Sequence, residues 1–126
     1  MTEKTTRWGM SQAEWAQARE RLGALLAEAA RARSTVTYGE AARRAFGGRF
    51  SARSGALMDL LSEVDTAEDA ARGVMIASLV VRADTGMPGD GYFAFAAREL
   101  GRDVTDREAF WRSEADAVWA SFEVRP

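Results

Sequence analysis

The side chains of this chain that could do chemistry are carboxylates, hydroxyls, arginines and a single lysine, Lys4. The 126 residues contain no cysteine and no histidine. Thiolate nucleophiles, Ser-His-Asp triads, imidazole bases and zinc sites built from Cys or His are therefore excluded. A site made only of carboxylates would need a cleft of its own. The composition thus predicts a non-enzymatic protein without a metal or cofactor.

A basic segment in the first half of the chain is the strongest candidate for binding chemistry. Residues 31–53 hold six arginines against one glutamate, a net charge of +5. Arginines and hydroxyls near helix ends are groups that contact the phosphates of a nucleic acid. We therefore expect this segment to bind nucleic acid, and DNA in particular. The residues predicted to bind nucleic acid are Tyr38, Arg43, Arg44, Arg49, Ser51 and Arg53.

Other interpretations of this segment stay open. Sixteen of the seventeen basic residues are arginine, so the segment is equally consistent with a solvent-exposed face in an Arg-rich chain. The five carboxylates of residues 54–71 give a net charge of −5 and would repel a phosphate backbone. We interpret them as a solvated face rather than a Mg²⁺ or Ca²⁺ site. The alternative function is a protein-interaction or regulatory module, in which this charge dipole matches another chain.

Helix signals alternate with two apolar or β-branched runs along the chain. Residues 11–14, 37–40 and 105–108 have the sequence of capping boxes. The apolar spacing predicts five helices, at residues 11–32, 37–46, 52–64, 92–100 and 105–122. Ser51 is the expected cap of the third helix, and a further short helical turn is expected at 66–69. Strands are expected at 35–37 and 74–81, paired with each other.

These elements predict a single domain, residues 1–126, of the mainly α (α+β) class, with 1–9 as a flexible N-terminus. It should be a winged-helix-like helical domain with a small two- to three-stranded sheet. Residues 34–91 supply the helix-turn-helix and the wing-like region. The glycine-rich loop 84–91 is interpreted as a turn, with a wing as the alternative. The expected common core is Leu22, Leu57, Leu61, Ile76, Val80, Phe110 and Val118.

Two short motifs in the basic segment resemble a known family. Residues 37–42, Thr-Tyr-Gly-Glu-Ala-Ala, resemble the Thr-Tyr-Gly-x-hydrophobic-Ala signature of the alkyltransferase and alkyltransferase-like DNA-binding domain. Residues 52–57, Ala-Arg-Ser-Gly-Ala-Leu, are similar to a shortened form of its recognition helix. The resemblance implies a winged helix-turn-helix in the minor groove, with Tyr38 on the backbone and Arg53 as the intruding arginine. The family's Pro-Cys-His-Arg block is absent, so alkyl transfer is not implied.

The Pro-Gly-x-Gly-Tyr-Phe run at 88–93 also resembles small bacterial proteins of uncharacterised activity. No run of about 18 apolar residues and no apolar signal core is present, so we expect a cytoplasmic protein without a membrane partner. Trp111, Trp119 and Phe122 give the last helix a large aromatic surface. We therefore expect a homodimer.

Overall fold

The computed structural model describes residues 8–123, and its chain is mainly helical, with a small two-stranded sheet. The mainly α (α+β) class is thus confirmed. The elements follow in the order α1 (Gln12–Arg31), β1 (Val36–Thr37), α2 (Tyr38–Phe46), α3 (Gly55–Arg72), the 3₁₀ turn η1 (Ile76–Leu79), β2 (Val80–Val81), α4 (Asp90–Glu99) and α5 (Arg107–Ser121). In this part of the chain no helix is long and apolar enough to cross a membrane.

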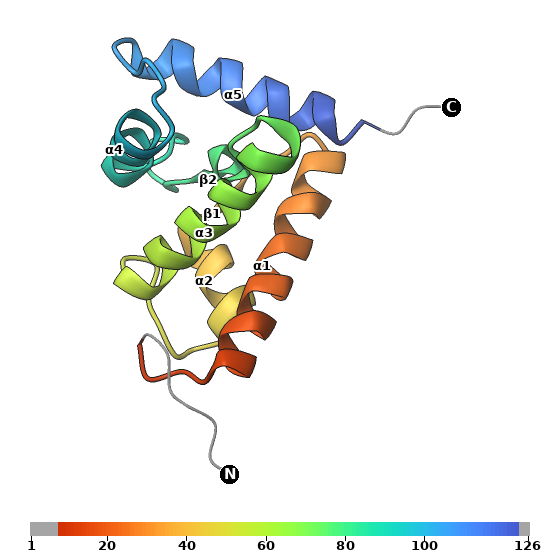
Figure 1. The fold of residues 1–126 in the computed structure, drawn as a ribbon, viewed down its shortest axis with the longest axis vertical. Helices are drawn as coiled ribbons and strands as arrows, with labels where there is room; N and C mark the ends of the chain where they lie inside the picture. The colour runs from red at the N-terminus through yellow and green to blue at the C-terminus, as the bar shows by residue number, and fades with distance from the viewer. Residues whose placement is uncertain (1–7, 124–126) are drawn as a thin grey trace.

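The long helices surround the η1 turn. Helices α1 and α3 both run up to α5, which crosses above their upper ends (Figure 1). Each of these three helices contacts η1, and α2 packs along α1. The largest fully buried side chains come from all of these elements except α2: Leu22, Leu26, Leu57, Leu60, Met75, Ile76, Leu79, Val80 and Val118. Six of the seven predicted core residues are buried, whereas Phe110 is partly buried and packs against the edge of the core.

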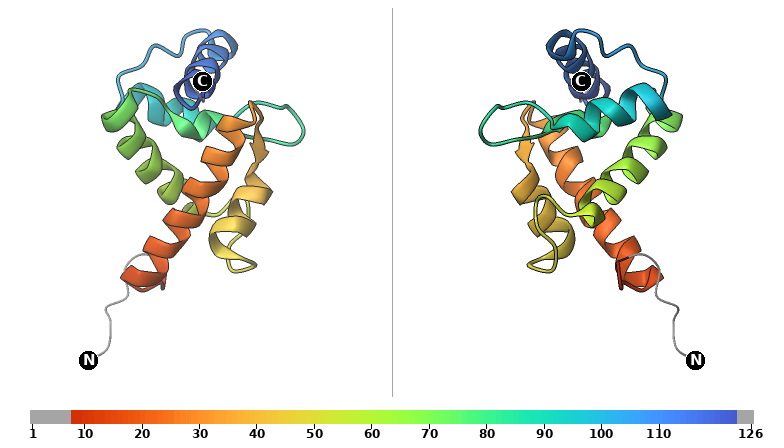
Figure 2. Two further views of the ribbon diagram at one scale, coloured as in Figure 1. Left: turned by 90° about the vertical axis from the view of Figure 1, so that its right-hand side faces the viewer. Right: turned by 90° about the vertical axis from the view of Figure 1, so that its left-hand side faces the viewer.

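The two strands pair as predicted, although each is short. Val36 pairs with Val80 and Thr37 with Val81, in parallel register. The two strands are parallel and form no antiparallel hairpin, so the predicted wing-like region at 84–91 corresponds to the loop between β2 and α4, and its role as a wing stays a prediction. Figure 2 shows that loop projecting beside β1, next to the start of α2.

The prediction of a continuous strand over 74–81 was wrong. Residues 76–79 form the η1 turn, and only Val80 and Val81 are extended. The reason is that side chains, not a neighbouring strand, satisfy this backbone: Asp65 accepts from the N–H of Ala77 at 2.8 Å, and Trp111 donates to the carbonyl of Ser78 at 2.8 Å. Buried backbone groups need partners, and here α3 and α5 supply them.

Three other predicted helix boundaries were wrong as well: both ends of α3 and the start of α5. Helix α3 begins at Gly55 and is capped by Ser54, not Ser51. It continues past 66–69 without a break and ends at Gly73, which has the left-handed conformation that favours glycine. Asp106, not Thr105, caps α5. The capping boxes at 11–14 and 37–40 are confirmed.

The aromatic residues of α5 are used within the chain. The indole N–H of Trp111 donates to Ser78, and that of Trp119 donates to the carbonyl of Ser34 at 3.1 Å. The guanidinium of Arg72 lies 3.9 Å from the centre of the Phe122 ring. These contacts cover much of the aromatic surface from which we expected a homodimer, and the dimer itself stays a prediction.

Candidate functional site

A cleft of about 550 Å³ opens where the start of α2 meets the loop 82–89 and the start of α4. Three parts of the chain form its walls. The first is Thr37, Tyr38 and Gly39 at the start of α2. The second is Ala52, Arg53 and Met58 around the start of α3, and the third is Val81 to Asp84 with Gly89 to Gly91. Ligand sites in proteins are commonly clefts of this size.

Two helices point their N-terminal ends at this cleft. Helix α2 begins at Tyr38, after the Thr37 cap. Helix α4 begins at Asp90, after Gly89, and has no side-chain cap. The first backbone N–H groups of a helix have no partner within it, and the helix dipole adds positive potential there. The cleft therefore favours an anionic ligand such as a phosphate.

Tyr38 joins the loop to α2. Its hydroxyl oxygen accepts a hydrogen bond from the N–H of Gly89 at 2.9 Å. Because the oxygen is the acceptor in that bond, its own hydrogen can be donated to a ligand. Burial raises the pKa of Tyr38 above its usual value, so the hydroxyl stays neutral and remains a donor.

The two acids at the cleft are both neutralised by arginines. Arg82 binds Asp84 through two hydrogen bonds of 2.9 and 2.7 Å, and these bonds lower the pKa of Asp84 to about 2. Arg107 pairs with Asp90 at 2.7 Å. These two pairs contribute no net charge, so the remaining arginines determine the charge of the cleft.

Arg53 and Arg43 supply that positive charge. Arg53 lines the cleft. Arg43 extends back along α2, and its Nη1 lies 3.5 Å from where a Cβ on Gly39 would stand. Within residues 8–123, the guanidinium groups of Arg43, Arg53 and Arg98 are the ones without a carboxylate, carbonyl or aromatic partner. Of these three arginines, Arg53 thus lines the cleft and Arg43 lies next to Gly39 in the cleft wall.

The structure places some of the predicted nucleic-acid-binding residues at the cleft and others in contacts away from it. Tyr38 and Arg53 line the cleft, and Arg43 lies beside it. Arg44 instead pairs with Glu28 of α1 at 2.6 Å. Arg49 pairs with Glu14 of α1 at 3.4 Å and donates to the carbonyl of Gly9 at 3.0 Å. The exposed Ser51 accepts from the backbone N–H of Arg53 at 3.3 Å.

The start of α4 is the part of the site that our list of predicted binding residues left out, although a wing at 84–91 was the alternative interpretation of this loop. Gly89, Asp90 and Gly91 line the cleft. The available signal was the glycine-rich loop 84–91, which we interpreted as a turn. The hydrogen bond from Gly89 to Tyr38, which cannot be inferred from the sequence, joins this loop to α2.

The acidic residues of α3 are largely engaged with other side chains. Trp15 donates to Glu63 at 2.7 Å, and Arg19 pairs with the same carboxylate at 3.2 Å. Arg102 pairs with Asp69 at 2.5 Å. These contacts reduce the repulsion that we expected this stretch to exert on a phosphate backbone. In the described part of the chain, no group of three or more carboxylates is placed to hold a metal ion.

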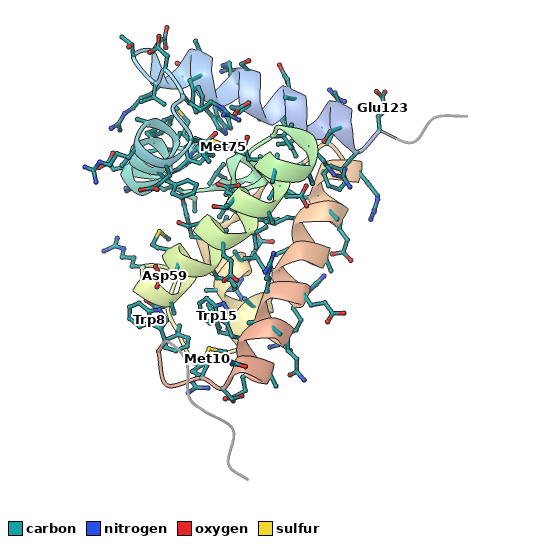
Figure 3. All side chains as sticks on the ribbon, in the orientation of Figure 1. Trp8, Met10, Trp15, Asp59, Met75 and Glu123 are labelled. Atoms are coloured by element: carbon teal, nitrogen blue, oxygen red, sulfur yellow. The ribbon has the colours of Figure 1, made fainter. Side chains whose placement is uncertain are left out.

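Trp8 covers the start of α3. Its indole N–H donates to Asp59 at 2.9 Å, and Figure 3 shows the two side chains next to each other. The ring lies against Gly55, where a Cβ would overlap the Trp8 Cη2 atom. Trp8 and Gly9 belong to the segment that we predicted to be flexible, and both make contacts with the helical domain. The prediction for residues 1–7 lies outside the described residues.

Gly55→Ala is expected to displace the Trp8 ring, because the new methyl group occupies the space of the indole. The Trp8 to Asp59 hydrogen bond should break, and the indole N–H resonance of Trp8 should shift in a two-dimensional NMR spectrum. Gly48→Ala is the matched control, since a Cβ there meets no atom within 4 Å. An unchanged Trp8 resonance in Gly55→Ala would contradict this packing.

No protein-family model matches the chain, and neither a curated protein nor a solved structure matches it. The resemblance of residues 37–42 and 52–57 to the alkyltransferase-like domain therefore stays an expectation. The function has to be argued from the geometry of the cleft.

Proposed function

We propose that the protein is a non-enzymatic nucleic-acid-binding module that holds backbone phosphates of DNA in the cleft between α2, the loop 82–89 and α4. The observation that carries the proposal is the convergence of two helix N-termini and two unpaired arginines, Arg43 and Arg53, on that cleft.

The chemistry of the cleft suits a phosphate diester. Backbone N–H groups at helix starts donate to phosphate oxygens, and the guanidinium of Arg53 can donate two parallel hydrogen bonds to the same group. The Tyr38 hydroxyl adds a neutral donor. Contacts of this kind position a protein on the backbone without reading the sequence of bases.

The connection between α2 and α3 agrees with this proposal. The two helices are joined by residues 47–54, and Arg53 stands two residues before the first residue of α3. An arginine next to the start of the second helix is the position that the alkyltransferase-like resemblance implies for groove contact. In this proposal Arg53 makes that contact, while Arg44 and Arg49 stabilise the packing of α2 and its following loop on α1.

A protein-interaction module has less support. Among residues 8–123, Trp8 is the one large hydrophobic residue that is exposed, with 45% of its surface accessible to solvent. Docking surfaces for stable partners ordinarily present a contiguous apolar patch, and a single tryptophan does not make one.

The dependence of duplex DNA binding on salt tests the proposal. Affinity falls with log salt with a slope of about 0.9 per phosphate neutralised. Replacing Arg43 and Arg53 together by alanine should therefore lower the slope by about 2 and weaken binding at low salt. The fold should persist, because both side chains are exposed and lack partners in the described structure.

The matched control is the double variant Arg44→Ala and Arg49→Ala, which changes the formal charge by the same amount. Its slope should stay close to that of the wild type, because these arginines are already paired with carboxylates of α1. The proposal is wrong if both double variants lower the slope equally. It is also wrong if the wild-type protein binds no duplex at about 50 mM salt and micromolar concentration.

A further inference from the structure

A second, narrower cavity of about 100 Å³ adjoins the cleft on its inner side. Tyr38, Met58 and Gly91 line both spaces, so this second space, called the inner cavity below, adjoins the cleft. Its remaining walls come from α3, η1 and α4. The inner cavity is not needed for phosphate binding, and the inference below does not depend on the proposed function.

A buried carboxyl group, that of Asp65, stands in the wall of the inner cavity. Asp65 is only 2% exposed. Its Oδ1 accepts from the N–H of Ala77, and within residues 8–123 its Oδ2 has no hydrogen-bond partner. No arginine pairs with it, unlike Glu63, Glu68 and Asp69 on the same helix. A buried carboxylate without a cation is unfavourable, so a positive group bound next to Asp65 would stabilise the ionised carboxylate.

The surroundings of Asp65 make the potential at the inner cavity negative. The titratable groups that face it are Glu68 and Asp69 of α3, Glu114 of α5, and the hydroxyls of Tyr38 and Tyr92. Burial, together with the charges of Glu114, Asp69 and Glu68, raises the pKa of Asp65 to about 7. Arg102 binds Asp69 and Glu114 and offsets part of their charge.

The other walls of the inner cavity suit a cation with an apolar body. Tyr38, Tyr92 and Phe95 present aromatic side chains, and Met58 and Leu61 are apolar. The Ser62 hydroxyl donates its hydrogen to the carbonyl of Met58 at 2.9 Å, which leaves its oxygen as an acceptor. Aromatic faces and acceptor oxygens both attract cations, and the apolar surface favours a short hydrocarbon stem.

We propose that the inner cavity binds a small organic cation, a primary ammonium or guanidinium group on a short apolar stem, with its charge against the Asp65 carboxylate. The cavity volume of about 100 Å³ equals the volume of roughly three water molecules in the liquid. A cavity of this size can hold a group of a few heavy atoms. The cation is either a free amine or guanidine, or the end of a lysine or arginine side chain from another polypeptide.

An NMR titration of the wild-type protein with methylguanidinium and with propylammonium chloride tests the site. Binding should shift the amide resonance of Ala77, whose N–H is bonded to Asp65, with a Kd on the order of 1 mM. At about pH 7 binding should also release a proton, because the cation stabilises the ionised carboxylate and the Asp65 O–H proton passes to the buffer. Methylurea, a neutral analogue of methylguanidinium, should cause no saturable shift.

Asp65→Asn keeps the acceptor for the Ala77 N–H and removes the charge, so it should weaken cation binding at least tenfold. Asp116→Asn is the control: it removes an exposed carboxylate of α5 that lines neither the cleft nor the inner cavity, and it should leave cation binding unchanged. The proposal is overturned if Asp65→Asn binds as the wild type does, if methylurea binds equally well, or if neither cation shifts Ala77 at about 50 mM.

A blocked arginine, N-acetylarginine methylamide, identifies the source of the cation. If it binds more tightly than methylguanidinium, the site takes an arginine side chain of another polypeptide. If it binds more weakly, the site takes a free small cation, because the flanking amides do not fit beside the inner cavity. A blocked arginine that binds equally well to Asp65→Asn contradicts the assigned role of Asp65.

Discussion

Replacing Asp65 by asparagine is expected to raise the free energy of unfolding by about 4 kcal/mol at about pH 8 and to change it little at about pH 4. The physical cause is the buried carboxyl group, whose pKa is raised to about 7 chiefly by desolvation. Asparagine keeps the hydrogen bond from Ala77 and never has to ionise.

The sign of this pH dependence follows from the two pKa values of Asp65. In the unfolded chain the carboxyl ionises near its ordinary pKa of 3.8, and in the folded chain near 7. Between these values the folded protein holds more protons, so the stability of the wild type falls as pH rises and levels off above about pH 7. Asp65→Asn should lack this decline.

Urea unfolding of the wild type and of Asp65→Asn across this pH range measures the effect. Asp84→Asn serves as the control of opposite sign. The pKa of Asp84 is lowered by its bonds to Arg82, so its replacement should not stabilise the protein. Parallel pH profiles for the wild type and Asp65→Asn would show that Asp65 is not a buried acid of raised pKa.

Leu26→Ala is expected to lower the free energy of unfolding by about 2–5 kcal/mol, because it removes three buried carbons and leaves a cavity. Leu26 is fully buried on α1, at 0% exposure, within the common core. Leu25 is its neighbour in sequence but is partly buried at the edge of that core.

Leu25→Ala is therefore the matched control, with the same atoms removed from the same helix. It should lower the free energy of unfolding by less than half as much, because its surroundings and solvent can fill the space. Denaturant titrations of both variants should differ in midpoint and share one slope. Equal losses for the two variants would show that Leu26 is no more deeply packed in the core than Leu25.

The local signals in the sequence were sufficient for much of the fold. The capping boxes at 11–14 and 37–40 involve residues three positions apart, so they can be recognised from the sequence without knowledge of the tertiary structure. The apolar runs also predicted the pairing of β1 with β2. The η1 turn could not be predicted in this way, since the groups that satisfy its backbone, Asp65 and Trp111, lie on other elements.

The candidate site was predictable in its residue types and not in its arrangement. Arg43 and Arg44 are adjacent in sequence, but successive residues of a helix point about 100° apart. Only the position of α1 shows that Arg44 faces Glu28 while Arg43 remains at the cleft side. The inner cavity was missed because the sequence does not distinguish Asp65 from the other acids of residues 54–71. The burial of Asp65 depends on η1 and α5, which lie on later parts of the chain.

The parallel pairing of β1 with β2 sets the order in which the protein can assemble. The paired residues, 36–37 and 80–81, are separated by the whole of α2, α3 and η1, so this contact closes a long loop of chain and should form late in folding. Helices α1 and α2 are neighbours in sequence and can dock early. The cleft takes walls from both sides of the late contact, so a ligand of the cleft binds only the completed fold and protects it against unfolding in proportion to its concentration.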